Sequence, residues 1–593
     1  MAVQEITQVA TPIHYTGISI PQRRLLVLIL NVVTTAPLLW AYLTSCTQPR
    51  AGPLDILILI CATICVPWPV VTFWNTLIGL CIVAFGKASK SIYPYFEADG
   101  SVPELASRTA LTIFMRNEDP EPTFNHLQAM HESLRRVNRL QHFRFVVLSD
   151  TTVPDVAQKE EECFSRIRQS LELGMFRGPV YRRREKNVGF KAGNIKDYLD
   201  KHSEGDDFFV PLDSDSAMSG DLLSRLVFSM EKHHQIGLLQ TLVVGMPAVT
   251  CVHTIRDSAG GPPTARCTGA TMPYNAIIRK KAFHENCMLP KLPGGPPLGG
   301  YILSHDLMET MSMRRAGYEV RLLPIETESY ETNPPTFLDY IRRELRWCQG
   351  TMQYWFLLNE PGLNAITRFQ VCQTITTYLS QACWVAMTLA YVWKVALGEI
   401  DGSHTHLGFT PQLILVVIGC YPKIAGLIDT AMTSFKRYGG ISRCLLAGLV
   451  EFILMTLIGP ATAVSVAVFL IGLLMGKSIS WDGQNRNRLG LSWRDTSRVF
   501  WPQFVIGISC AVALYVRWKD AESMTWALPL VVGLCLNVPF AVITASPRLG
   551  RLMTRLRWFM IPEEFKMPAL LSLLVDPETA SAHTASHGKQ KSI

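Results

Sequence analysis

The hydrophobic residues of this chain gather into long blocks that are separated by polar stretches. Several blocks approach or exceed the roughly 20 apolar residues that a helix needs to cross a bilayer. They cover residues 25–46, 54–85, 371–397, 409–428, 444–475, 500–518 and 524–544. Hydrophobic residues make up 48% of the chain and charged residues only 18%, whereas soluble domains are about one-quarter charged. The pattern therefore predicts a polytopic α-helical membrane protein.

Two of these blocks precede a long polar insert. The first block is long, lacks a small-residue cleavage pattern and is followed at once by the second, so we interpret it as a membrane helix and not as a signal peptide. Between residues 91 and 369 the sequence is mixed and polar, which leaves room for one or two soluble domains. We expect the chemistry of the protein to lie in this insert.

Strand-like and helix-like runs alternate within the insert. Residues 110–116, 143–150 and 208–213 are short β-rich runs that end in polar residues, and residues 123–139 and 156–173 between them have helical spacing. This alternation predicts βαβ units and a largely parallel sheet. Ligands of such sheets bind at the carboxyl ends of the strands, so the polar residues at these ends are candidates for a site.

The distribution of basic residues predicts the membrane topology. Lys and Arg gather near helix ends on the cytoplasmic side of a membrane. Residues such as Arg23, Lys90 and Arg443 flank one set of ends, whereas the loop 398–408 holds Glu399 and no Lys or Arg. This bias predicts a multi-pass membrane protein with the insert and both termini in the cytoplasm.

The block at residues 444–475 does not fit a simple crossing. A continuous helix of this length would measure roughly 48 Å, and Pro460 removes a hydrogen bond near its middle. A single crossing would also place the basic loop that follows outside the cell. We therefore predict an interfacial or re-entrant segment, a cytoplasmic loop at residues 477–499, and six crossings in total. A double crossing would give eight.

These patterns divide the chain into five regions, with the lipid bilayer as an expected partner. They are an N-terminal membrane region with two transmembrane helices (residues 1–90), a cytoplasmic α/β domain (91–335), interfacial helices (336–369), a C-terminal membrane region with four crossings (370–560), and a partly disordered cytoplasmic tail (561–593).

Asp213-Ser214-Asp215, at the end of an apolar strand, is the sharpest local feature of the insert. Two carboxylates one residue apart on a turn supply the hard oxygen ligands that Mg²⁺ or Mn²⁺ prefers, while a phosphorylated substrate fills other positions. The structural alternative is a strand end followed by a helix cap. Because this motif is short, the sequence alone leaves both interpretations open.

Two further segments supply groups suited to phosphates and sugars. Residues 187–194 place Lys191 in a turn of small residues. Residues 342–350 combine arginines with Trp347; guanidinium groups bind phosphates through two parallel hydrogen bonds, and an indole face can stack on a sugar ring. Trp347 could equally be a core residue where the insert meets the membrane.

Cysteines and net charge exclude other classes. None of the 15 cysteines forms a Cys-x-x-Cys pair, so we interpret them as small hydrophobic residues. The net charge is only +8, and the basic run at residues 181–186 is typical of a solvated face. Nucleic acid is therefore not an expected partner.

Five motifs in chain order resemble those of processive family 2 glycosyltransferases, the group of cellulose, chitin and hyaluronan synthases. The D, KAGN, DxD, ED-type and QxxRW motifs of that family are matched by Asp150, Lys191-Ala-Gly-Asn194, Asp213-Ser-Asp215, Asp306 and Arg343-Glu-Leu-Arg346-Trp347. The stretches LPKLPGGPPLGGYILSHDLMETMSMRRAGY, YNAIIR and RRELRWCQG are similar to the branch that makes osmoregulated periplasmic glucans. The resemblance covers about residues 25 to 565.

The resemblance implies a cytoplasmic GT-A (Rossmann-like) domain that uses UDP-glucose and a divalent cation, Mg²⁺ or Mn²⁺. It further implies a membrane channel for the growing β-glucan, a β-1,2-linked backbone and acyl carrier protein as a partner. It assigns Glu118 and Asp150 to the uridine, Lys191 and Arg346 to the diphosphate, Asp213 and Asp215 to the diphosphate and metal, and Trp347 to the acceptor sugar.

The chain departs from the family pattern at two places. Arg343 stands where the QxxRW motif has Gln, which leaves the role of this substrate-binding position open. The loop after residue 477 stands where cellulose synthases have a gating loop, and it lacks their motif. Its Trp481 and Gln484 either cover the nucleotide or anchor the loop at the membrane surface.

A β-glucan made from the α-linked donor requires inversion, and therefore one base for the acceptor hydroxyl. Asp306 is our candidate base. The purely structural alternative is that Ser304 caps a helix that begins near Asp306. An acidic side chain in the first turn of that helix would be favourable. The neighbouring His305 has no evident ligand set, so a zinc site is not expected.

Two other functions remain as alternatives. One is a different β-glycan synthase, with a cellulose-like or chitin-like product, because the sequence does not fix the linkage. The other is a transporter with a cytoplasmic nucleotide-binding regulatory domain, although the chain has no GxxxxGK[ST] motif.

Overall fold

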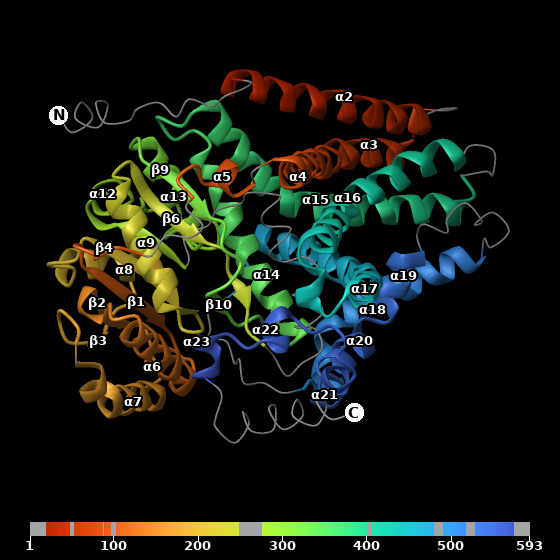
Figure 1. The fold of residues 1–593 in the computed structure, drawn as a ribbon. Coiled ribbons are helices and arrows are strands. Elements are labelled where there is room, and N and C mark those ends of the chain that lie inside the picture. The colour runs from red at the N-terminus through yellow and green to blue at the C-terminus, as the bar shows by residue number, and fades with distance from the viewer. Residues whose placement is uncertain are drawn as a thin grey trace.

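A soluble α/β domain and a bundle of long helices lie side by side in the computed structural model, with helix α14 (Phe337–Met352) between them (Figure 1). The structure describes residues 19–47, 52–86, 88–96, 102–172, 174–247, 275–399, 405–479, 490–516 and 528–574. The soluble domain is formed by the insert that the sequence predicts.

A mixed sheet of seven strands forms the centre of the soluble domain, in the order β3-β2-β1-β4-β8-β6-β9. All neighbours are parallel except β8, which runs antiparallel to β4 and β6. The strands are β1 (Thr109–Met115), β2 (Phe143–Ser149), β3 (Val180–Arg183), β4 (Phe208–Asp213), β6 (Ile236–Thr241), β8 (Ala276–Arg279) and β9 (Glu319–Leu323). The prediction of a largely parallel sheet is therefore confirmed.

Alternate residues of each strand enter two different cores. Leu111, Ile113 and Met115 of β1 join the core under α6 (Pro120–Arg136), α7 (Pro154–Glu172) and α9 (Gly220–Lys232). Ala110 and Phe114 join the core under α8 (Phe190–Lys201), α12 (Lys280–Asn286) and α13 (Asp306–Arg315). This alternation follows from the two-residue period of a strand, and it covers both faces of the sheet with helices.

The elements predicted from the pattern are present with small shifts at their ends. The strands β1, β2 and β4 match the three predicted runs to within one residue. Helix α6 begins earlier than expected, because Pro120 has a fixed φ that suits the first helical position. A second, small sheet of β5 (Ala217–Met218), β10 (Ser329–Glu331) and β7 (Val244–Gly245) brings residue 331 beside the end of β4.

Five helical segments of the described chain are long and apolar enough to cross a membrane, which supports the predicted membrane protein. They lie in α2 (Ile20–Thr47), in α3 (Pro53–Cys65) together with α4 (Pro67–Phe85), and in α16 (Thr405–Thr433), α17 (Ile441–Leu474) and α18 (Trp493–Val516). Helix α15 (Ala365–Leu397) packs along α3 although it is not one of the five.

Two predicted features of the bundle are different in the structure. The break expected at Gly459-Pro460 is wrong, because α17 is continuous over 34 residues. Pro460 cannot donate to the carbonyl of Thr456, and α19 (Leu528–Cys535) approaches this carbonyl so closely that a Cβ on Gly533 would lie 3.1 Å from its oxygen. Helix α19 thus packs against α17 at the turn where Pro460 leaves this carbonyl without its helical donor.

The last predicted crossing is divided into two short helices, α19 and α20 (Asn537–Thr544). Pro539 has no N–H to donate to the carbonyl of Cys535, which accounts for the interruption between them. The residues before α19, from 517 to 527, lie outside the described part of the chain.

The segment after the bundle returns to the soluble domain. It contains α21 (Pro547–Leu556), α22 (Pro562–Phe565) and α23 (Ala569–Ser572), and Figure 1 shows α23 beside α6. Leu570 and Leu571 are each only 3% exposed and belong to the core beneath α6. Residues 569–574, expected to form part of a loose tail, therefore pack into the soluble domain, whereas α22 contacts the short helix Phe435–Tyr438 of the bundle.

This packing predicts that Leu571→Ala destabilises the soluble domain, although the residue lies far from it in sequence. Deleting a buried leucine side chain costs about 2 to 5 kcal/mol of unfolding free energy. Pulse proteolysis of the purified protein in a urea series should reveal the loss. Ser572→Ala, at the exposed neighbouring position, is the control and should stay within about 0.5 kcal/mol. Equal behaviour of the two variants would contradict the assignment.

Candidate active site

Asp150 marks the end of β2 and is held by three side chains. Arg184 donates from Nε and Nη2 to its two carboxylate oxygens at 2.7 and 2.6 Å. Asn194 Nδ2 donates to Oδ1 at 2.9 Å, and Asn187 Nδ2 donates to the Asp150 carbonyl at 2.6 Å. Asp150 is therefore a fixed, charge-compensated group at the carboxyl edge of the sheet.

The basic run at residues 181–186 corrects a sequence expectation. The side chain of Arg184 is only 9% exposed and that of Arg182 only 14%, and the latter pairs with Asp197 at 3.0 Å. Arg183, at 43% exposure, is the one of these three arginines that fits a solvated face. Glu185 and Lys186 are exposed as well, so the run is only in part a solvated face, and Arg184 turns inward to Asp150 at the ligand-binding edge.

The KAGN motif forms the first turn of α8, which closes tightly over the preceding loop. Gly189 and Phe190 have positive φ values of 75° and 53°, and a Cβ on Gly193 would lie 1.9 Å from the Val188 carbonyl oxygen. Glycine is therefore required at position 193. The turn directs Lys191 toward the end of β4.

Lys191 and Asp213 form an ion pair, with Nζ 2.5 Å from Oδ1. Burial lowers the pKa of Lys191, but the carboxylates of Asp213, Asp306 and Glu331 outweigh this effect and the net pKa is raised. The cation thus lies within the field of residues from three elements, β4, α13 and β10. This cluster joins the KAGN, DxD and ED-type positions in one site.

Asp215 and Ser214, the other two residues of the turn after β4, contact two different parts of the domain. Asp215 is buried and accepts a hydrogen bond from Thr332 at 2.7 Å. Ser214 donates to Glu118, which follows β1. The preceding Asn117 has a positive φ of 52° and accepts at its side-chain oxygen from Thr152 N, so the loops after β1 and β2 are joined.

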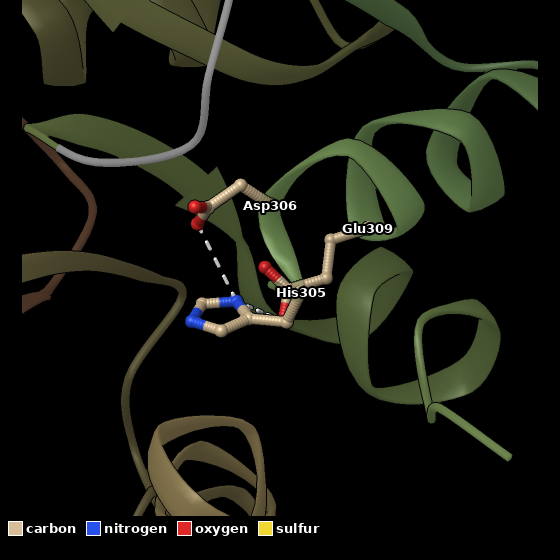
Figure 2. Close-up of side chains that lie close together, drawn as sticks. All are labelled: His305, Asp306 and Glu309. Atoms are coloured by element: carbon tan, nitrogen blue, oxygen red, sulfur yellow. Dashed lines mark ion pairs between the residues drawn. The ribbon is translucent and has the colours of Figure 1, made fainter. Parts of the chain in front are cut away.

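His305 lies between two carboxylates of α13, as Figure 2 shows. Its Nδ1 is 3.0 Å from Glu309 Oε1 and 3.5 Å from Asp306 Oδ1. The side chains of His305 and Glu309 are 9% and 3% exposed, whereas that of Asp306 is 28% exposed. Asp306 is thus the member of this group that remains open to a substrate.

The buried carboxylates favour a protonated imidazole. Burial by itself lowers the pKa of His305, but Glu309 and Asp306 raise it to about 9. Among the described residues, His305, Asp306 and Glu309 form one group whose ligand atoms lie within 4.8 Å of one another, so the ligand set judged absent from the sequence does exist. A cation at this group would have to displace the proton from His305.

The loop before α13 is held by the end of α14. Tyr354, just beyond α14, donates to the carbonyl of Ser304 at 3.0 Å, and Gln353 accepts from Leu303 N at 2.8 Å. A Cβ on Gly350 would lie 2.7 Å from Ser304 Cβ. The prediction that Ser304 caps α13 is wrong, because His305 takes the N-cap position and Ser304 instead packs against α14.

The RxxRW motif lies on α14. Arg343, which replaces the family's Gln, stacks its guanidinium 4.7 Å from the Trp347 ring and 5.7 Å from the Tyr340 ring. Trp347 is 42% exposed, so it is not the core residue that was the alternative interpretation. Arg346 is one residue before it on the same helix. Trp481 and Gln484 lie outside the described residues.

Sequence reasoning missed several residues of the site. Arg184 could not be recognised from the sequence, because its partner Asp150 is far away in the chain. Only the order of the strands in the sheet brings the two side chains together. Glu309 had a usable signal, because it lies one helical turn after His305. Glu331 had none, since it belongs to the short strand β10 of the second sheet.

Comparisons with known proteins agree with the geometry. The sequence model of the family described as "Glycosyl transferase family group 2" matches residues 208–428. The protein named glucans biosynthesis glucosyltransferase H from Xanthomonas campestris pv. campestris (strain B100) is 30% identical over 575 residues, which cover 91% of this chain and 87% of the relative. The protein of the same name from Rhodopseudomonas palustris (strain ATCC BAA-98 / CGA009) is 30% identical over 586 residues, which cover 93% and 78%.

Two solved structures show only low similarity to this chain. A mannosyltransferase from Pyrobaculum calidifontis in complex with GDP-Man and Mn²⁺ has a TM-score of 0.40 and 12% identity, covering 63% of this chain and 98% of its own. Glucosyl-3-phosphoglycerate synthase from Mycobacterium tuberculosis has a TM-score of 0.27 and 14% identity, covering 47% and 86%.

The His305–Glu309 pair predicts a pH-dependent contribution to stability. A histidine whose pKa in the folded state exceeds its unfolded value of about 6.5 stabilises the folded protein. This contribution is fully present at pH values below about 6.5. The contribution is lost as the pH rises through about 9. His305→Asn should therefore lower the unfolding free energy by about 3 kcal/mol at pH 6, and the difference from the natural protein should shrink by pH 9.5.

Thermal unfolding of the purified protein at both pH values checks this expectation. The control is His284→Asn, which removes an exposed histidine that pairs with Asp200 at 2.7 Å. An exposed ion pair is worth little, so this variant should show no comparable pH dependence. A His305→Asn deficit that is constant from pH 6 to 9.5 would contradict a protonated His305.

Proposed function

Because this chain belongs to the glucans biosynthesis glucosyltransferase H family, we propose that it is a membrane glucosyltransferase that builds a linear β-glucan from UDP-glucose. Its soluble domain has the GT-A fold, inserted in a membrane protein, which confirms the predicted fold class. The observation that carries the proposal is the convergence of Lys191, Asp213 and Asp306 in one charged cluster at the carboxyl edge of the sheet.

We assign the donor side of the site to the ends of β2 and β4 and to the start of α8. Lys191 would receive the diphosphate, for which its fixed position beside Asp213 is suitable. Glu118 and the Asp150–Arg184 pair would line the nucleoside end. Arg346 adds a guanidinium suited to phosphate oxygens. Trp481 and Gln484 would cover the nucleotide from the loop at residues 477–499.

Asp213 and Asp215 would hold a divalent cation, Mg²⁺ or Mn²⁺. They present hard carboxylate oxygens at the end of one strand, which is the donor set these ions prefer. When bound, the cation supplies positive charge for the departing diphosphate. When no cation is bound, Lys191 neutralises Asp213. Like the cation, Lys191 also offers positive charge to the leaving group.

Asp306 is the base in the proposed reaction. Its carboxylate takes the proton of an acceptor hydroxyl while that oxygen forms a bond to C1 of glucose. The bond from C1 to the diphosphate oxygen breaks in the same step, UDP leaves with the electron pair, and the α-linked donor becomes a β-linked product. Partial exposure of Asp306 leaves it accessible to the acceptor, and the fixed loop at Ser304 holds its position.

Trp347 supplies an exposed flat face for the acceptor sugar. We extend the proposal to a processive reaction whose growing β-glucan leaves through the membrane helices for periplasmic glucan synthesis. A β-1,2 linkage and a contact with acyl carrier protein are further parts of the proposal that rest on the family resemblance. The bacterial inner membrane is the corresponding location, with the soluble domain in the cytoplasm.

Release of UDP from UDP-glucose by the purified protein tests the reaction class. Asp306→Asn should lower the turnover rate at least about 100-fold, since a positioned general base contributes that much, while donor binding is retained. The matched control is Asp155→Asn, an exposed acid in the first turn of α7. A transporter with a regulatory nucleotide site would bind UDP-glucose without turnover, and full turnover of Asp306→Asn would exclude the base assignment.

Chelation tests the proposed cation. Treatment with EDTA should abolish UDP release, and Mg²⁺ or Mn²⁺ should restore it, because the departing diphosphate then regains its counter-charge. Asp215→Asn should raise the cation concentration needed for half-maximal rate at least about tenfold. Unchanged turnover after complete removal of divalent ions would refute a metal role for these carboxylates.

A further inference from the structure

Four aromatic rings and one guanidinium form a continuous stack from a membrane helix to the acceptor side of the site. We call this set the α14 stack; it consists of Phe500, Phe337, Tyr340, Arg343 and Trp347. The rings of Phe500 and Phe337 are 5.4 Å apart with an angle of 13°, and those of Phe337 and Tyr340 are 6.2 Å apart with an angle of 15°. The guanidinium carbon of Arg343 lies 5.7 Å from the Tyr340 ring and 4.7 Å from the Trp347 ring.

Helical spacing explains why these groups align. Phe337, Tyr340, Arg343 and Trp347 are separated by three, three and four residues, so they lie along one face of α14. Exposure rises along the stack: Phe500 is 0% exposed, Phe337 is 1% exposed and Trp347 is 42% exposed. The stack is therefore anchored at its membrane end and open at its site end.

The anchored end belongs to the membrane bundle. Phe337 packs with Phe500 of α18 and, edge-on at 5.9 Å, with Phe540 of α20. Helix α18 begins at Trp493, within the predicted loop at residues 477–499. One turn beyond Trp347, Gly350 contacts Ser304, which precedes the proposed base. Helix α14 thus contacts both the bundle and the loop that carries Asp306.

We propose that Arg343 is a positioning residue for the acceptor, and that the α14 stack couples Trp347 to the position of α18. This inference rests on the proposed function, in which Trp347 binds the acceptor sugar. Cation–π contacts of its guanidinium with the Tyr340 and Trp347 rings hold the indole in place. Glutamine, the residue of the wider QxxRW motif at this position, carries no charge and cannot make these contacts.

The coupling follows from the close packing of rigid planar groups. A shift of α18 moves Phe500, and Phe337 must follow because it is buried against it without free space. The displacement then passes through Tyr340 and Arg343 to the exposed indole. A glucan that moves through the bundle would in this way shift Trp347, the residue that holds its terminal sugar.

Product length and kinetics of Arg343→Gln test the positioning role. With UDP-glucose as donor, we expect glucan chains about tenfold shorter, because loss of the cation–π contact weakens the hold on the acceptor. The KM for UDP-glucose should stay within about twofold, because the proposed role of Arg343 is at the acceptor and not at the donor. Arg343→Lys keeps a cation and should recover part of the length.

Arg342→Gln is the matched control, because it removes the same charge from the adjacent position. Its side chain is 57% exposed and points toward Asp339, so product length should not change. Equal effects of the two variants would show that charge on α14 and not the stack is responsible, which would overturn the proposal. A raised donor KM in Arg343→Gln alone would also overturn it, by placing Arg343 at the donor.

Phe500→Leu tests the coupling from the membrane side. It should shorten the product in the same direction, and the double variant with Arg343→Gln should be no worse than the more affected single variant, as expected for residues acting through one pathway. Independent, multiplying effects would refute the coupling. Binding of UDP-glucose serves as the fold check for each variant, and absence of UDP release by the natural protein would instead disprove the proposed function.

Discussion

Pairing of buried charges is the constraint on which the site depends. An ion removed from water costs several kcal/mol unless a partner compensates it, and three acids of the site have a cationic partner: Arg184 for Asp150, Lys191 for Asp213 and His305 for Glu309. The cations come from different elements than most of the acids. The positions of β3 and α8 are therefore fixed as much by charge as by apolar packing.

The sequence allowed the sheet and much of the site to be predicted, because both depend on local pattern. A strand such as β1 shows its alternation within seven residues, and Asp213 and Asp215 are recognisable at a strand end. Arg184 was misjudged because its burial depends on the order of strands in the sheet. Ser304 was misjudged because Tyr354, 50 residues later in the chain and just beyond α14, donates a hydrogen bond to its hydroxyl oxygen.

The membrane region shows the same limit of local rules. Pro460 predicted a break in α17, but the helix is continuous. Conversely, the apolar block near residue 536 was predicted as one crossing, and the structure divides it into two helices. Helix α14 connects this region to the soluble domain, and the stacked side chains on one of its faces make it a rigid link. The replacement of glutamine by Arg343, an unexplained departure in the sequence, has a structural reason in that stack.

The packing of α23 beneath α6 has a consequence for biosynthesis. Leu570 and Leu571 complete a core whose other members begin with residues near position 93, so the ribosome must release almost the whole chain before this core can close. The membrane helices between these two segments will by then have been inserted. The soluble domain therefore reaches its final form only after the bundle that adjoins it exists, which prevents a half-made chain from acting before its surroundings are in place.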